Sequence, residues 1–240
     1  MELLRKIRRR IYRRFEENRI KTIHRLHRNK HTDVYNRINA ILDAFHGAGG
    51  LKHEFQAYKL FSLNRILEEQ NPKTILELGT GSTTPVFSDY VKQSNDRCLT
   101  AVDQDEKWLK NSMALANVEK DDERFRFILS EKTFLKDRSP WESKYDVKLE
   151  AFYDLVFIDG PSLVHDGVKN KDAVNSNIFD LAFPHVVLVD IRRATVDEIV
   201  KRMGDHYDCV QSDVISKRFH EEYKYFTEFY LKRNVENSGY

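Results

Sequence analysis

Short apolar runs that end at polar residues recur along most of this chain, and they limit the folds it can adopt. They alternate with segments whose apolar side chains recur every three or four positions. Such short runs fit strands buried on both faces, and the intervening segments fit helices that cover a sheet. The pattern predicts an α/β fold with a mostly parallel seven-stranded sheet and helices on both faces.

The expected elements follow this alternation from residue 73 onward. Strands are expected at residues 74–78, 98–102, 125–129, 154–158 and 185–189, with 209–211 and 227–231 as the last two. Helices are expected at residues 85–93, 106–116 and 195–203.

The first 72 residues differ from the rest because they contain helical patterns and no strand pattern. Helices are expected at residues 3–28, 34–45 and 54–70, and Asn71-Pro72 ends the third because a residue before proline disfavours helix. We therefore expect a helical N-terminal extension made of a basic arm at 1–31 and a helical cap at 32–72. The cap packs on a main domain at 73–240.

The charge of the chain is unevenly distributed. Residues 1–31 hold 12 Lys/Arg and three acids, a net of +9, whereas the remainder holds 28 Lys/Arg and 35 acids, a net of −7. The basic residues and helical spacing of residues 3–28 therefore predict a basic amphipathic helix that binds an anionic membrane surface. Packing on the domain and a dimer contact are equal alternatives. No nucleic-acid partner is expected, because the main domain is acidic and contains no recognisable nucleic-acid-binding module.

The two cysteines, Cys98 and Cys209, form no metal-ligand or disulfide pattern. The chain also has no apolar run of about 18 residues and no secretory signal pattern. These features favour a cytoplasmic protein, with a peripheral position at the inner membrane surface as the alternative if the arm binds lipid.

A glycine turn follows the first expected strand, in the segment ILELGTGSTT (75–84). Gly79 and Gly81 permit unusual backbone angles and let a ligand approach the main chain. Glu77 precedes the turn and could attract a cationic amino group. Thr83 stands where dinucleotide-binding turns carry a third glycine, so close packing of a pyrophosphate is less well served.

Asp103 lies at the end of the second expected strand, a position from which a carboxylate can bind both hydroxyls of a ribose. Enzymes that use NAD share this device, so Asp103 indicates a nucleoside without choosing which one. A helix N-cap is the simpler alternative for this residue, as a plain strand-to-helix turn is for the glycine segment.

With these motifs the chain resembles the class I S-adenosylmethionine-dependent methyltransferases, most of all the small-molecule and sugar O-methyltransferases. The resemblance covers roughly residues 50–235 and rests on ILELGTGSTT (75–84), AVDQD (101–105), YDLVFIDGP (153–161) and VVLVD (186–190). It implies a Rossmann-like α/β fold with a site for S-adenosylmethionine. The cofactor-binding residues would be Glu77, Gly79, Thr80, Gly81, Thr83, Asp103, Gln104, Ser130 and Glu131, with the last three beside the adenine.

Two further acids, Asp159 and Asp190, end adjacent expected strands. Two carboxylates at one sheet edge could hold Mg²⁺ and leave open positions for substrate hydroxyls. Related metal-dependent enzymes usually carry another Asp or Asn after the second acid, where this chain has Ile191. His165 could instead serve with Asp159 as the catalytic acid/base pair.

Simpler roles are open for these three residues as well. Asp159 could form the turn before Gly160-Pro161, Asp190 could pair with a neighbouring arginine, and His165 could be an ordinary loop histidine.

The sequence as a whole favours methyl transfer from S-adenosylmethionine to a hydroxyl of a small-molecule or carbohydrate acceptor. The alternatives are an NAD-linked oxidoreductase, a catalytically inactive binding or scaffold module, and a nucleic-acid methyltransferase.

Overall fold

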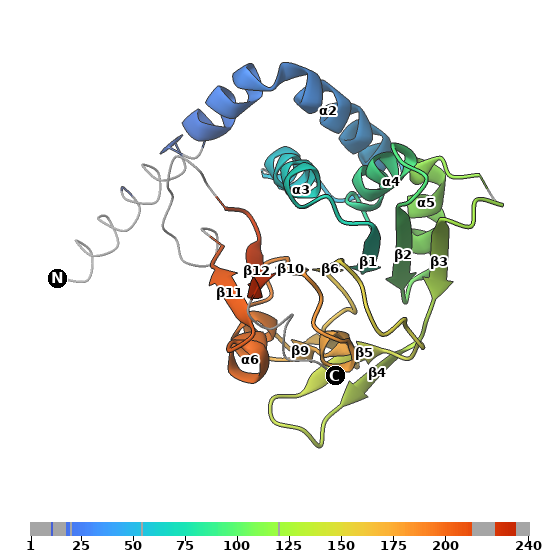
Figure 1. The fold of residues 1–240 in the computed structure, drawn as a ribbon, viewed down its shortest axis with the longest axis vertical. Helices are drawn as coiled ribbons and strands as arrows, with labels where there is room; N and C mark the ends of the chain where they lie inside the picture. The colour runs from blue at the N-terminus through green and yellow to red at the C-terminus, as the bar shows by residue number, and fades with distance from the viewer. Residues whose placement is uncertain are drawn as a thin grey trace.

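A seven-stranded sheet forms the centre of the molecule (Figure 1). The computed structural model describes residues 11, 18–19, 21–53, 55–119, 121–212 and 224–233. The strand order is β11-β12-β10-β6-β1-β2-β3. β12 runs antiparallel to both of its neighbours, and the other pairings are parallel. The expected mostly parallel seven-stranded α/β sheet is confirmed.

The strands lie close to their expected places. Their bounds are β1 Thr74–Leu78, β2 Cys98–Asp103, β3 Phe125–Leu129, β6 Leu155–Ile158, β10 Val186–Val189, β11 Tyr207–Val210 and β12 Thr227–Leu231. Successive residues enter two different cores: Ile75 and Phe157 pack on one face of the sheet, and Leu76 and Ile158 on the other. Because both faces are covered, these strands read as continuous apolar runs rather than as alternating patterns.

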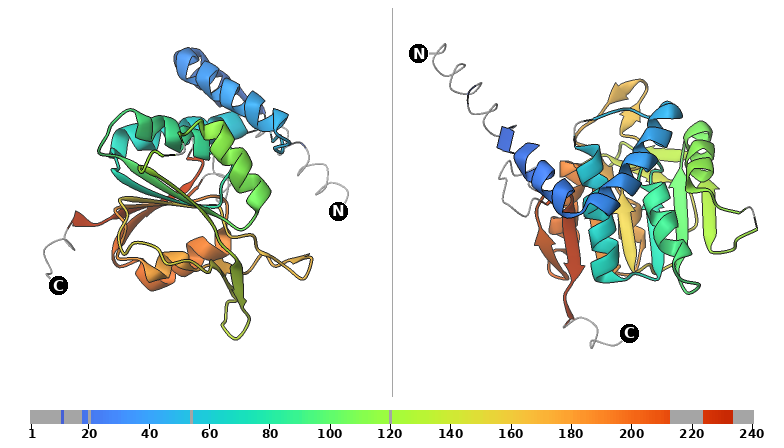
Figure 2. Two further views of the ribbon diagram at one scale, coloured as in Figure 1. Left: turned by 90° about the vertical axis from the view of Figure 1, so that its right-hand side faces the viewer. Right: turned by 90° about the horizontal axis from the view of Figure 1, so that it is seen from above.

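Helices cover both faces, but unequally (Figure 2). Helices α3 (Gln56–Gln70), α4 (Thr84–Lys92) and α5 (Glu106–Ala116) lie on one face, and α6 (Arg193–Met203) lies on the other. α3 ends where the sequence predicts, with Asn71 as its C-cap at a φ of 48°.

Part of the second face is covered by strands that the sequence did not predict. A three-stranded sheet contains β4 (Lys132–Leu135), β5 (Glu142–Tyr145) and β9 (Val174–Asn175), and β7 (Val164–His165) pairs with β8 (Val168–Lys169) in a hairpin. A short 3₁₀ helix, η1 (Asn177–Asp180), follows β9. The chain therefore passes from β3 to β6 through strands instead of a helix.

The N-terminal region packs on the outer side of the helical layer. Residues 21–30 are helical, the chain turns at His31, and α2 (Thr32–Gly47) follows and contacts α3. Ile23 is buried, and His24 stacks on Tyr58 of α3 with ring centroids 4.3 Å apart. This end of the expected arm thus contacts α3 of the helical cap. Most of the stretch 3–28 lies outside the described residues, so its membrane or dimer contact stays a prediction.

Among the helices formed by the described residues, none combines the length and apolar character needed to span a membrane.

Candidate functional site

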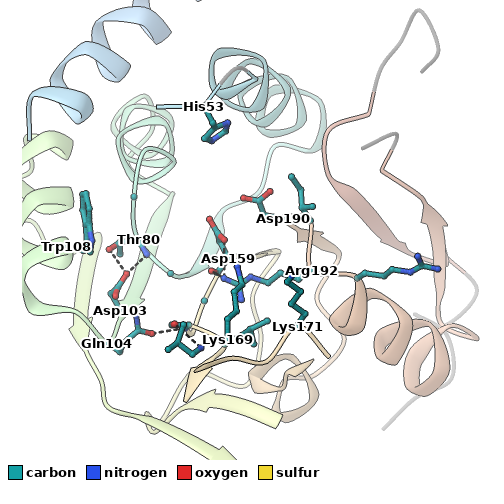
Figure 3. Close-up of a pocket in the computed structure, with 18 of the residues that line it drawn as sticks. His53, Thr80, Asp103, Gln104, Trp108, Asp159, Lys169, Lys171, Asp190 and Arg192 are labelled. Atoms are coloured by element: carbon teal, nitrogen blue, oxygen red, sulfur yellow. Dashed lines mark hydrogen bonds and ion pairs between the residues drawn. The ribbon is translucent and has the colours of Figure 1, made fainter. Parts of the chain in front are cut away.

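The carboxyl ends of β1, β2, β6 and β10 meet at one edge of the sheet, which is where ligands bind in open α/β folds. An open cavity of about 810 Å³ lies there, a volume typical of small-molecule and cofactor sites. Figure 3 shows Asp103 and Gln104 on one side of the cavity, Asp159, Arg192 and Asp190 near its centre, and His53 above them. Among the proposed site residues, the cavity is lined by Gly79, Thr80, Gly81, Asp103, Gln104, Asp159 and Asp190.

The glycine turn is shaped by a close approach between two strand ends. Gly79 has a φ of +96°, and a Cβ placed on it would lie 2.7 Å from the backbone nitrogen of Gly160. A side chain at Gly79 would therefore be strained and would collide with the backbone after β6. Gly81 has open space around it, so its position does not require glycine on steric grounds.

Asp103 fixes this turn to the end of β2. Its Oδ2 accepts hydrogen bonds from the backbone N–H and the hydroxyl of Thr80, at 2.8 and 2.9 Å, and its Oδ1 accepts one from the N–H of Asp105 at 2.9 Å. The cap of α5 is Asp105, whose side chain accepts from Lys107 and Trp108. The N-cap alternative for Asp103 is therefore wrong, and its carboxylate is positioned at the cavity wall.

Glu77 and Thr83 lie beneath the turn and are not among the residues that line the cavity. Glu77 is fully buried, and its Oε1 accepts a 2.5 Å hydrogen bond from the hydroxyl of Thr83. Its Oε2 is buried without a hydrogen-bond partner. Burial raises the pKa of Glu77 to about 8, although the threonine hydroxyls oppose that shift. The structure thus places both residues as supports of the turn.

Of the three residues expected beside an adenine, only Gln104 lines the cavity, although the backbone N–H of Ser130 donates to the carbonyl oxygen of Asp103 at 2.9 Å. The side-chain oxygen of Gln104 accepts from the N–H of Ser162 at 3.0 Å, and Gln104 lines the cavity. Ser130 is buried, Glu131 is exposed, and neither lines it. Trp108 does line it, next to Asp103, and stacks on Phe45 with centroids 5.7 Å apart.

A lysine from α3 lies between the two acids at the strand ends. The Nζ of Lys59 donates to Asp159 Oδ2 at 3.3 Å and forms a very short contact with Asp190 Oδ2. The ammonium also faces the ring of Phe157, 5.5 Å from its centroid. The side chain of Lys59 is 7% exposed, against 38% for Asp159 and 10% for Asp190.

The two acids have different surroundings. Arg192 pairs with Asp159, its Nη2 contacting both Oδ1, at 3.2 Å, and the backbone oxygen. Both carboxylate oxygens of Asp159 are therefore engaged, whereas Oδ1 of Asp190 is buried without a partner. The expected pairing of Asp190 with a neighbouring arginine is wrong, because Asp190 pairs with Lys59.

These contacts set the protonation of the cluster. Burial alone would raise the pKa of Asp159, but Lys59 and Arg192 outweigh it and hold that pKa below its ordinary value. Burial, only partly offset by Lys59, raises the pKa of Asp190 to about 6, and Asp159 adds to the rise. Burial lowers the pKa of Lys59, but Asp190 and Asp159 outweigh it and raise that pKa overall, so the ammonium stays charged. The hydroxyl of Tyr225 is another titratable group that interacts electrostatically with Asp190.

The residues present do not fit the expected Mg²⁺ site. The point between Asp159 and Asp190 is filled by the ammonium of Lys59, and the described residues contain no group of three or more His, Cys, Asp or Glu side chains that could hold a metal. A divalent cation needs several oxygen ligands, and the ammonium already uses one carboxylate oxygen from each acid. The metal expectation is therefore corrected.

The expected pairing of His165 with Asp159 is also not observed. His165 lies on β7, stacks on Phe134 with centroids 4.9 Å apart, and pairs with Asp166 at 3.0 Å. It lines a separate hollow beside Trp141. Its ring serves the packing of the hairpin, which agrees with the ordinary loop histidine alternative.

Sequence reasoning missed several residues of the cavity. They include the lining residues Phe45, His53, Trp108, Lys169, Lys171, Arg192 and Tyr225. Lys59, which binds two acids of the lining, was missed as well. One signal was available for Lys59. It lies on the same helix face as Phe55, Ser62 and Leu63, so the helix pattern predicts that it is buried. A fully buried lysine is almost always paired with an acid, which would have pointed to Asp159 or Asp190 as its partner.

Comparison with solved structures places the fold in a known class. An O-methyltransferase from Bacillus cereus, in complex with SAH, is similar with a TM-score of 0.52 and 14% identity, over 81% of this chain and 90% of that one. A Klebsiella pneumoniae protein assigned as an O-methyltransferase is similar with a TM-score of 0.51 and 18% identity, over 81% of this chain and 89% of that one. No protein-family model matches the chain. A search of curated proteins gave no match either.

At these identities the likeness shows the fold alone, which is the mostly parallel α/β sheet that the chain shares with these two structures.

Proposed function

We propose that the protein transfers a methyl group from S-adenosylmethionine to a hydroxyl of a small-molecule or carbohydrate acceptor. The observation that carries this proposal is the carboxylate of Asp103, which is held by Thr80 of the glycine turn and lies in the wall of the cavity. Asp159 and Asp190 lie in the same cavity, so nucleoside-binding and acceptor-binding groups share one space.

The cofactor half of the cavity comprises β1, β2 and the start of α5. Asp103 is suited to bind ribose hydroxyls, and the indole of Trp108 beside it offers a flat face to an adenine. Gly79 and Gly81 leave the backbone open to the methionine part. Glu77 would act from below, through the turn that it supports, rather than by direct contact.

The acceptor half centres on Asp190. S-adenosylmethionine supplies an electrophilic methyl group on a sulfonium and leaves as a neutral thioether, so the protein must align the acceptor and remove its proton. Asp190 is the group that we assign to this proton, because the residue lines the cavity and its Oδ1, although buried, has no hydrogen-bond partner. The oxygens of Asp159 are engaged by Lys59 and Arg192, which makes Asp159 a positioning residue.

Thermal shift with S-adenosylhomocysteine and with NAD tests the cofactor assignment. A rise in melting temperature with S-adenosylhomocysteine alone supports the proposal, and a rise with NAD alone favours the oxidoreductase alternative. Transfer of a labelled methyl group to a panel of sugars and phenols then tests turnover. Cofactor binding without transfer to any hydroxyl compound would favour a binding module.

A further inference from the structure

We propose that Lys59 is a built-in cation that takes the place of a divalent metal between Asp159 and Asp190, so that this site works without one. The inference rests on the proposed function in that the cavity is taken as the active site. The inference goes beyond the proposed function by naming Lys59 as the group that provides positive charge on the acceptor side of the cavity.

The position of the ammonium carries the argument. Lys59 Nζ contacts one oxygen of each acid and faces the ring of Phe157, and its side chain is 7% exposed. A metal bridging the same two carboxylates would need this space. The lysine belongs to α3, outside the strands that carry the acids, so the site is assembled from the cap and the sheet together.

The charge count of the cluster leads to the same conclusion. Two carboxylates face one ammonium and the guanidinium of Arg192, which pairs with Asp159. The cluster is therefore already neutral. A divalent cation could enter only by displacing Lys59, and a displaced buried ammonium would lose both of its partners.

The position of Asp190 suggests a use for this arrangement. Lys59 occupies Oδ2 of Asp190, the other oxygen of that carboxylate is buried without a hydrogen-bond partner, and Asp190 is one of the residues that line the cavity. An acceptor hydroxyl bound by Asp190 would lie next to the ammonium. In metal-dependent sites a bound cation provides this positive charge.

Calorimetric titration with Mg²⁺ and with Mn²⁺ tests the proposal on the intact protein. For the natural chain we expect no binding up to about 10 mM, well above the weak end of protein carboxylate sites. Lys59→Met removes the ammonium at similar length and leaves Asp190 without a cationic partner, while Arg192 still pairs with Asp159. This variant should bind the cation with a Kd of about 1 mM, a gain of at least tenfold.

Thermal unfolding gives a second measurement on the same variants. Lys59→Met should lower the melting temperature by about 10 °C, because it leaves the buried carboxylate of Asp190 without its ion pair, and Mg²⁺ should restore part of the loss. Lys59→Arg should keep a cation in place and gain no metal binding. Lys52→Met, at an exposed lysine just before α3, is the matched control and should change neither property.

Metal binding by the natural chain at about millimolar concentration would overturn the proposal, and this result does not depend on any variant folding. A folded Lys59→Met that neither binds nor is stabilised by Mg²⁺ would also overturn it. Binding of S-adenosylhomocysteine, measured on the same samples, separates the two ideas. If the natural chain does not bind S-adenosylhomocysteine, the proposed function is refuted, whereas the metal titration still tests the role of Lys59 independently.

Discussion

Replacing Glu77 by glutamine should stabilise the protein, and the gain should grow with pH. Glu77 is fully buried beneath the glycine turn, one of its oxygens is held by Thr83, and the other has no partner. Burial raises its pKa from 4.5 to about 8. Glutamine keeps an oxygen for the hydroxyl of Thr83 and removes the charge.

The magnitude follows from the two pKa values. Below pH 4.5 the carboxyl is protonated in both the folded and the unfolded chain, so its ionisation does not affect stability. Between that pH and about 8 the folded chain keeps a proton that the unfolded chain releases. The free energy of unfolding then falls by about 1.4 kcal/mol per pH unit. The total loss approaches about 5 kcal/mol above pH 8, which is the difference of 3.5 units between 8 and 4.5 multiplied by 1.36.

Urea unfolding followed by tryptophan fluorescence at several pH values from about 5 to 8 measures this loss. The difference in unfolding free energy between Glu77→Gln and the natural chain should increase by about 2.7 kcal/mol over two pH units inside this window. Glu123→Gln, at an exposed glutamate, should show no such trend. A Glu77→Gln difference that stays constant with pH would refute the reasoning, because it would mean that the buried carboxyl titrates normally.

The site and the arm give four further predictions. Asp103→Ala should weaken S-adenosylmethionine binding by roughly ten- to a hundredfold in calorimetry, since a charge-assisted hydrogen bond is lost. Gly79→Ala should lower the unfolding free energy by about 2–4 kcal/mol in urea titration, whereas Gly81→Ala, with open space around it, should change it far less. If Asp190 accepts the proton, kcat/KM should rise about tenfold per pH unit up to its pKa of about 6 and then level off, so a flat profile down to pH 5 would exclude it as the base. The full chain should float with anionic vesicles at low salt and not at high salt, and deletion of residues 1–20 should abolish flotation while leaving the packed residues from 21 onward intact.

The central sheet could be predicted because its strands are buried on both faces. Ile75 and Leu76, or Phe157 and Ile158, enter opposite cores, so each strand reads as an uninterrupted apolar run. The small sheet has no such signal. β5 has the sequence ESKY, in which the buried Glu142 forms ion pairs with Arg138 and Arg202. A pattern of hydrophobicity cannot detect a strand whose buried residues include a charged side chain.

The candidate site likewise contains some residues that the sequence predicts and others that it does not. Asp103 and Gly79 lie in a local strand-turn-helix motif, so the sequence placed them correctly at the cavity. Lys59 is 100 residues from Asp159 and 131 from Asp190, and no local pattern connects such positions. Without the lysine, two acids at neighbouring strand ends read as a metal site. The error came from predicting the anions without the cation that the cap contributes.

The ion pairs of Lys59 join α3 to the sheet, and they therefore limit which parts of the chain could be exchanged as a module. A chain starting at residue 73 would keep all seven strands of the central sheet but would leave Asp159 and Asp190 without the ammonium between them. Two neighbouring carboxylates in that condition repel each other, so one of them would take up a proton. The helical cap is therefore not an accessory that could be exchanged between related domains unless the incoming helix carried its own positive charge. Any exchange would have to move α3 together with the ends of β6 and β10.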